Sequence, residues 1–158
     1  MSQSKVIGFV GLGQMGGPMA SNITAGGADI IVYDKAGTAE RAPEGAKLAN
    51  SFESVLNSAD TVFLSVPDGP VSLALAKEIA ASKDRRATVI VDLSTIGPEA
   101  AREANEILSA AGVTYIDAPV SGGQAGAKAG TITVMWGGPK PVMDEHEDVL
   151  KSFSKNVF

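Results

Sequence analysis

Cysteine is missing from the 158-residue sequence, and histidine occurs once, at His146. The lack of cysteine excludes disulfide frameworks, cysteine-based zinc sites and cysteine nucleophiles. A single histidine excludes a multi-histidine metal site and any catalytic triad that His146 does not reach. We therefore expect no metal site, and a chemistry that depends on a bound cofactor.

Basic clusters and long apolar runs are also lacking. The net charge is −5, and Arg85-Arg86 is the only adjacent basic pair, so we expect neither nucleic acid nor a membrane surface as a partner. No apolar run approaches the ~20 residues that span a bilayer. Met1 to Lys5 are polar and lack the layout of a signal peptide. We expect a soluble, cytoplasmic protein.

Apolar runs alternate with segments of helical period along the whole chain. The pattern predicts strands at 6–10, 30–33, 61–66, 88–93, 113–120 and 131–136. It predicts helices at 15–25, 52–58, 70–81, 98–111 and 139–153. Strands separated by helices favour a Rossmann-type, doubly wound α/β fold, with a mostly parallel sheet and helices on both faces. We interpret residues 1–158 as one dinucleotide-binding domain.

A glycine pattern, G-x-G-x-x-G, joins the first predicted strand to the first predicted helix. In this pattern the first glycine permits a tight turn, the second lets a pyrophosphate approach the backbone, and the third lets the helix pack on the strand. The helix N-terminus adds N–H donors for the phosphates. The candidate cofactor-binding residues here are Gly11, Leu12, Gly13, Gln14, Met15 and Gly16.

Asp34 ends the second predicted strand, close to the ~20 residues after the pattern at which an acid is expected. A carboxylate at this place accepts hydrogen bonds from the adenosine ribose and repels a 2′-phosphate, which favours NAD over NADP. Lys35 follows directly, and a cation there is able to hold that phosphate. NAD is the favoured cofactor, and NADP stays open.

Four segments resemble the β-hydroxyacid dehydrogenases, the family of 3-hydroxyisobutyrate dehydrogenase and tartronate semialdehyde reductase. They are GFVGLGQMGGPMASN at 8–22, SVPD at 65–68, DLSTIGP at 92–98 and DAPVSGG at 117–123, the last continuing to residue 131. The 6-phosphogluconate dehydrogenases share the V-S-G-G core but usually lack the preceding D-A-P. That group, with the imine reductases, is an NADP-dependent alternative.

The resemblance implies further site residues. It places Val66, Pro67 and Thr95 along the cofactor, with Thr95 beside the nicotinamide and its ribose. Taken alone, Ser94 and Thr95 before Gly97-Pro98 also indicate a cap for the helix that begins at Pro98. Both roles are possible together, with one of the two residues capping the helix and the other facing the cofactor.

The substrate's acid group is expected on Ser121, Gly122 and Gly123. A hydroxyl followed by two glycines presents N–H groups suited to a small carboxylate. His146, surrounded by acidic residues that we interpret as a solvated face, is expected to be a partly packed helix residue rather than a catalytic base.

A proton donor for hydride transfer is not found. In the family this role belongs to a lysine in a G-x-x-G-x-G-x-x-x-K segment, which the sequence does not contain. We therefore place no catalytic residue in this chain, and we expect a C-terminal helical domain, with most of a homo-oligomer contact, to be absent from it. The parent is expected to be an NAD-dependent 3-hydroxyacid dehydrogenase, and this chain alone to show negligible turnover. A non-catalytic NAD-binding module is the alternative.

Overall fold

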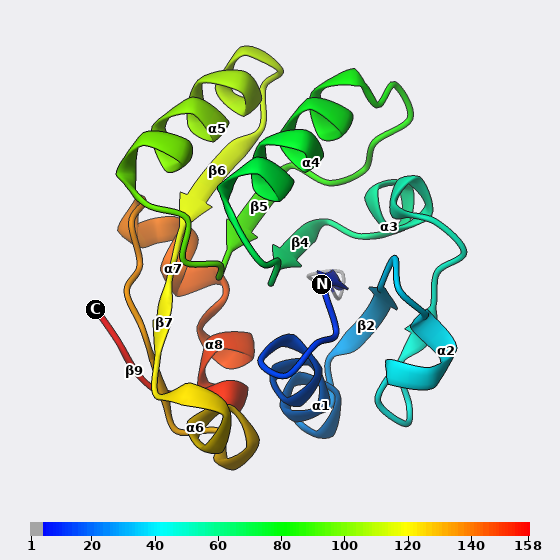
Figure 1. Cartoon of the computed structure of the whole chain (residues 1–158), viewed down its shortest axis with the longest axis vertical. Helices are drawn as coiled ribbons and strands as arrows, with labels where there is room; N and C mark the ends of the chain where they lie inside the picture. The colour runs from blue at the N-terminus through cyan, green and yellow to red at the C-terminus, as the bar shows by residue number, and fades with distance from the viewer. Residues whose placement is uncertain (1–4) are drawn as a thin grey trace.

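The computed structural model describes residues 5–158, and the polar residues 1–4 lie outside it. Six parallel strands form the main sheet in the order β3-β2-β1-β4-β5-β6 (Figure 1). They are β1 (Val6–Val10), β2 (Asp29–Tyr33), β3 (Lys47–Leu48), β4 (Thr61–Leu64), β5 (Val89–Asp92) and β6 (Thr114–Asp117). The direction of winding reverses between β1 and β4, so the predicted doubly wound, Rossmann-type fold is confirmed.

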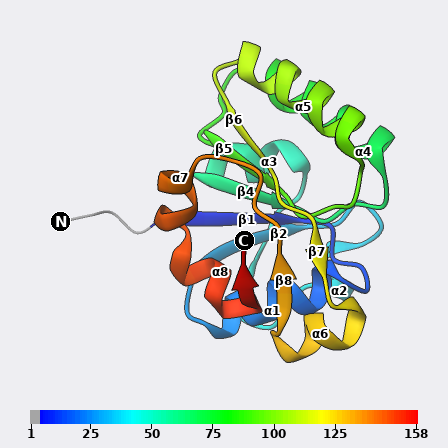
Figure 2. The same ribbon diagram turned by 90° about the vertical axis from the view of Figure 1, so that its left-hand side faces the viewer.

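Helices cover both faces of this sheet (Figure 2). One face carries α1 (Gly16–Ala25), α6 (Gly123–Ala129), α7 (Lys140–Glu145) and α8 (Glu147–Phe153). The other carries α3 (Phe52–Ser58), α4 (Gly69–Ala81) and α5 (Pro98–Ala110), while the short α2 (Thr38–Arg41) follows β2. No helix within residues 5–158 is both long and apolar enough to cross a membrane.

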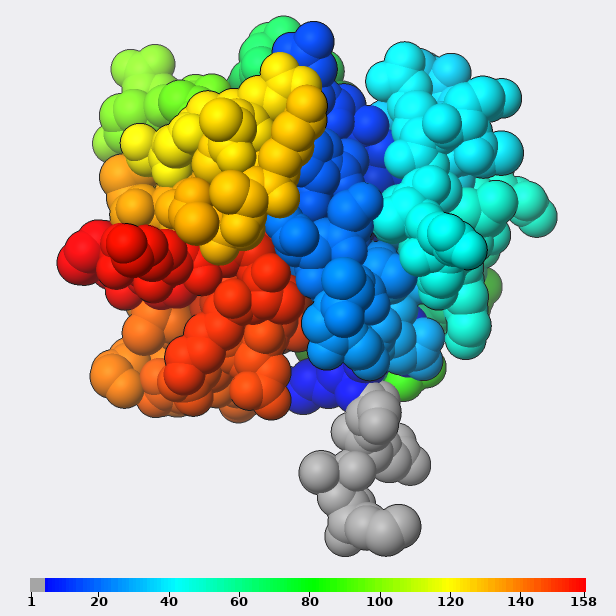
Figure 3. All heavy atoms as spheres, turned by 90° about the horizontal axis from the view of Figure 1, so that it is seen from below, coloured from blue at the N-terminus to red at the C-terminus, as the bar shows by residue number. Residues whose placement is uncertain are grey.

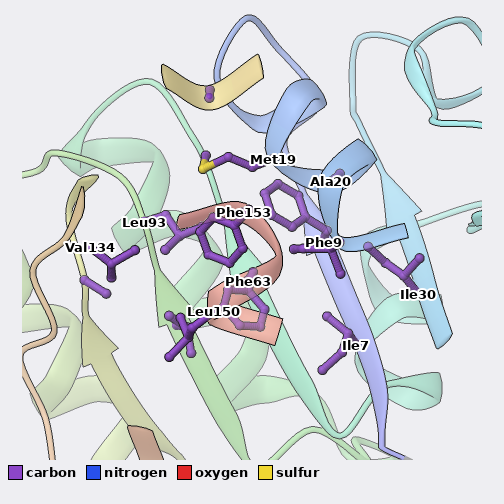
Figure 4. Close-up of a cluster of buried hydrophobic side chains, with 14 of the residues drawn as sticks. Ile7, Phe9, Met19, Ala20, Ile30, Phe63, Leu93, Val134, Leu150 and Phe153 are labelled. Atoms are coloured by element: carbon purple, nitrogen blue, oxygen red, sulfur yellow. The ribbon is translucent and has the colours of Figure 1, made fainter. Parts of the chain in front are cut away.

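Two apolar clusters lie between the sheet and these helices. Because side chains alternate along a strand, Phe9 packs into one cluster and its neighbour Val10 into the other. Figure 4 shows the first cluster, in which Phe9, Phe63 and Phe153 meet. The central strands are apolar on both faces because both faces are covered by helices.

A small second sheet follows β6. It consists of β7 (Val120–Ser121), β8 (Ile132–Val134) and β9 (Ser154–Val157), with β8 antiparallel to β7 and parallel to β9. The single strand predicted at 113–120 is therefore wrong, because the chain leaves the main sheet at Ala118-Pro119 and proline has no N–H for a ladder. The segment between β7 and β8 forms α6, a helix that was not predicted because its glycines hide the helical period.

The helix predicted at 139–153 is wrong as one element, because it breaks into α7 and α8 at His146. His146 is only 1% exposed, so it is fully buried rather than partly packed. Its Nδ1 lies 2.7 Å from the carbonyl oxygen of Val142 and must donate to it. The Nε2 atom then accepts from the Thr61 hydroxyl at 2.7 Å, and this hydrogen bond joins the residue between α7 and α8 to the start of β4.

Acid is expected to destabilise the protein partly through this histidine. Burial lowers the pKa of His146, and the charge of Lys5 lowers it further, against a raising effect of the Val142 hydrogen bond and Glu145. As the pH is lowered through about 6.5, the unfolded state therefore binds more protons at His146 than the native state does. The free energy of unfolding decreases as the pH is lowered through this range. Urea unfolding at about pH 7.5 and about pH 5.5 should show a smaller loss in His146→Gln than in the wild type. Equal losses would contradict this role.

Candidate functional site

The glycine pattern forms a tight turn between β1 and α1. Gly11 has φ +99° and its N–H donates to the Tyr33 carbonyl at 3.0 Å, so the turn is tied to β2. A Cβ on Gly11 would overlap the Ser65 carbonyl oxygen, and one on Gly16 would overlap the Gly11 carbonyl oxygen. Both glycines are therefore required by packing within the protein.

Gly13 differs from its neighbours in the pattern. It is exposed, and a Cβ built on it would meet nothing within 4 Å. No contact within the protein therefore requires a glycine at this position. Bare backbone in front of a helix N-terminus is the feature that lets a pyrophosphate approach closely. Gln14 is exposed and Met15 half-buried on the same turn.

The Asp34 carboxylate is bonded directly to the glycine turn. Its Oδ2 accepts from the backbone N–H of Leu12 at 2.7 Å, and its Oδ1 accepts from the N–H of Ala36 at 2.8 Å. Each oxygen keeps a second acceptor site, because a carboxylate offers about four in all. Lys35 is exposed beside it. The Leu12 bond was not foreseen, because nothing in the spacing specifies which loop N–H the acid reaches.

The β4–α4 and β5–α5 loops lie side by side at the carboxyl edge of the sheet. Val66 and Pro67 follow β4, and Thr95 is exposed after β5. The buried Ser94 hydroxyl accepts from the Val66 N–H at 2.8 Å. The predicted cap on α5 is wrong, because the N-cap is Gly97 and it makes no side-chain capping bond.

A buried carboxylate under these loops was missed by sequence reasoning. Asp92 is fully buried, and its oxygens accept from the Ser72 hydroxyl at 2.8 Å, the Tyr115 hydroxyl at 3.0 Å and the Ser94 N–H at 3.0 Å. Burial and the neighbouring Asp92 charge raise the pKa of Tyr115, and they likewise raise that of Asp117. The available signal was an acid at the end of the otherwise apolar strand VIVD.

The segment proposed for the substrate's acid group lies next to α1. Ser121 ends β7, Gly122 follows it and Gly123 begins α6; all three are exposed, with φ +135° at Gly122 and +64° at Gly123. The Asn22 side chain, on α1, donates to the Ala127 carbonyl of α6 at 2.9 Å. Figure 3 shows this segment, in yellow, packed against α1, in blue. The candidate substrate-binding residues thus lie at the start of α6, and the glycine turn lies at the start of the neighbouring helix α1.

Comparison with known proteins gives consistent matches. Residues 6–158 match the family described as the NAD binding domain of 6-phosphogluconate dehydrogenase. The 3-hydroxyisobutyrate dehydrogenase of Pseudomonas aeruginosa is 37% identical over 156 residues, covering 96% of this chain and 52% of that protein. The NAD-dependent L-serine dehydrogenase of the same species is 34% identical over 158 residues, covering 98% and 53%.

A solved structure agrees with these sequence matches. That of Mycobacterium tuberculosis 3-hydroxyisobutyrate dehydrogenase with L-serine superposes with a TM-score of 0.88 at 31% identity, covering 99% of this chain and 54% of that one. The chain spans about half the length of the relatives that it matches. With the strand order and glycine turn described above, it belongs to the family of 6-phosphogluconate dehydrogenase NAD-binding domains, as an NAD(P)-binding domain homologous to the 3-hydroxyacid dehydrogenases.

Proposed function

We propose that this chain is the NAD-binding part of an oxidoreductase that interconverts a 3-hydroxy acid and its semialdehyde by hydride transfer. The observation that carries the proposal is the Asp34 carboxylate, held at 2.7 Å by the Leu12 N–H beside the open backbone of Gly13. An acid fixed at that place has acceptor sites for a ribose next to a turn that accepts a pyrophosphate. The site therefore fits a dinucleotide with a free adenosine 2′-hydroxyl.

The two halves of the dinucleotide lie on opposite sides of β1 in this proposal. The adenosine ribose is held by Asp34 at the end of β2, and the pyrophosphate by the turn at Gly13. The nicotinamide then extends across β1 toward Val66, Pro67 and Thr95, because ligands cross such sheets where the winding reverses. When bound, the cofactor supplies the hydride acceptor or donor, and this chain's residues hold and orient it.

The substrate is proposed to be a small 3-hydroxy carboxylate held by Ser121, Gly122 and Gly123. Two observations support this class. The segment is exposed, and its two glycines adopt positive φ, which leaves a turn of backbone without side chains that a carboxylate is able to approach. The two relatives are named for 3-hydroxyisobutyrate and L-serine, and both of these compounds are 3-hydroxy acids.

NADH is expected to bind about tenfold or more tightly than NADPH, because Asp34 repels a 2′-phosphate. Calorimetric titration of the purified chain with each nucleotide measures the ratio. Asp34→Asn removes the charge and keeps an amide oxygen for the Leu12 N–H, so it should bring the two affinities close together. Lys35→Ala is the matched control, and it should leave the preference for NADH in place.

Two results of this titration would contradict the proposed role of Asp34 or the proposed function. Tighter binding of NADPH, lost in Lys35→Ala, would mean that the lysine rather than Asp34 selects the cofactor. Binding of neither nucleotide to the folded wild-type chain would overturn the proposed function of these residues.

A further inference from the structure

We propose that Asp92 and Ser94 are positioning residues, which together hold the β4–α4 loop in place beneath the nicotinamide half of the dinucleotide. The inference rests on the proposed function and adds residues that do not themselves touch the cofactor. Both are buried, Asp92 completely and Ser94 with 5% of its surface exposed. They act through Val66, the residue that begins the loop.

The contacts form a short relay from the core to the loop. Asp92 Oδ1 accepts the Ser94 N–H at 3.0 Å, which fixes the backbone just after β5. The hydroxyl of Ser94 in turn accepts the Val66 N–H at 2.8 Å. The other oxygen of Asp92 is held by the hydroxyls of Ser72 and Tyr115, from α4 and β6. The carboxylate is thus fixed from three elements and cannot move away from Ser94.

The Val66 bond matters because the loop has few other anchors. Ser65 directly follows β4 and stays bonded to β1, since its N–H donates to the Val10 carbonyl at 2.9 Å. Pro67 has no N–H to donate. Asp68 is already the N-cap of α4, where its side chain accepts the Val71 N–H at 3.1 Å. Within residues 65–68, all of which the structure describes, the Val66 N–H is the backbone donor seen to bond the β5–α5 loop.

The relay serves only one half of the site. Asp34 follows β2, on the other side of β1, and is joined through Leu12 to the glycine turn at the end of β1. In the described part of the chain, the turn packs against Ser65 but is not hydrogen-bonded to Val66. None of the hydrogen bonds of Asp34 or the turn described above involves Asp92 or Ser94. Loss of the relay should therefore weaken contacts to the nicotinamide and its ribose while leaving the adenosine and phosphate contacts intact. A residue that merely stabilised the fold would affect both halves alike.

Titration of Ser94→Ala with NADH and, in parallel, with ADP tests this directly. ADP carries the adenosine and phosphates without the nicotinamide riboside. The Kd for NADH is expected to rise about tenfold, because the Val66 N–H loses its acceptor, while the Kd for ADP stays within about twofold. Ser154→Ala is the matched control: Ser154 is 6% exposed and donates to the Leu150 carbonyl, far from these loops. It should change neither Kd.

Equal weakening of NADH and ADP binding, or no change in either, would overturn the inference while leaving the proposed function standing. A wild-type chain that binds neither NADH nor ADP would overturn the proposed function and the inference with it. Should Ser94→Ala not fold, Ser94→Cys fills the same space with a much weaker acceptor. It is held to the same criterion, a loss of NADH affinity without a loss of ADP affinity.

Discussion

Gly16→Ala is expected to destabilise the protein by about 3 kcal/mol or more and to abolish dinucleotide binding. The third glycine of the pattern lies where α1 starts against the turn. A Cβ at this position would overlap the Gly11 carbonyl oxygen and come within 3.1 Å of the Ser65 side chain. The first of these neighbours is backbone, which is tied to β2 through the Tyr33 carbonyl and cannot rotate away. Chemical denaturation and calorimetric titration measure the two losses.

Gly13→Ala is the matched variant for separating packing from binding. Its new methyl group would meet nothing within 4 Å, and its φ lies outside the left-handed region, so stability should stay within about 0.5 kcal/mol of the wild type. Binding of NADH should nevertheless fall at least about tenfold, because the methyl group occupies the space that a pyrophosphate needs. A Gly13→Ala protein that binds NADH normally would show that this turn does not hold the phosphates. A stable Gly16→Ala protein would contradict the packing argument.

Sequence patterns were sufficient for five strands of the main sheet, because these strands are largely buried, but they missed the edge strand β3, whose two residues are exposed. The run Thr61–Leu64, for example, is buried throughout and forms a single strand. The alternation of strands and helices, with right-handed connections, predicts a parallel sheet, whereas the order of its strands comes from the structure. Local information failed where the chain changes sheets after β6: β8 lies within the strand predicted at 131–136, but β7 was merged with β6. There the outcome depends on long-range pairing of β7, β8 and β9, which no local period encodes.

The candidate site shows the same division. The glycine turn and Asp34 lie together, as the spacing predicted, because strand ends in a parallel sheet share one edge. The hydrogen bonds that hold the loops in place were not predictable in this way. From the sequence, Ser94 was open to capping a helix or facing the cofactor, whereas in the structure its hydroxyl accepts the Val66 N–H of the neighbouring loop. The His146 hydrogen bond to Thr61 joins residues 85 apart in sequence, a distance at which spacing carries no information.

Phe63→Ala is expected to cost about 3–5 kcal/mol of unfolding free energy, the range for large aromatic truncations in a core. Phe63 is the centre of the cluster between the sheet and α8 (Figure 4). Its ring stacks on Phe9 with centroids 6.3 Å apart and meets the edges of Phe153 at 6.2 Å and His146 at 6.3 Å. The three neighbours come from β1, α8 and the break before α8. Removing the ring therefore leaves a cavity where the sheet, α8 and the histidine meet.

Phe158→Ala is the matched control, since Phe158 is 76% exposed and the same atoms are removed from the surface. Its unfolding free energy should stay within about 0.5 kcal/mol of the wild type. Urea unfolding of both variants gives the comparison, with the slope of the transition reporting any change in the surface exposed. A cost below about 2 kcal/mol for Phe63→Ala would mean that α8 collapses onto the sheet and refills the space. Because β4 also leads into Val66, such a collapse would change the loop itself, and NADH affinity would fall although the protein stayed folded.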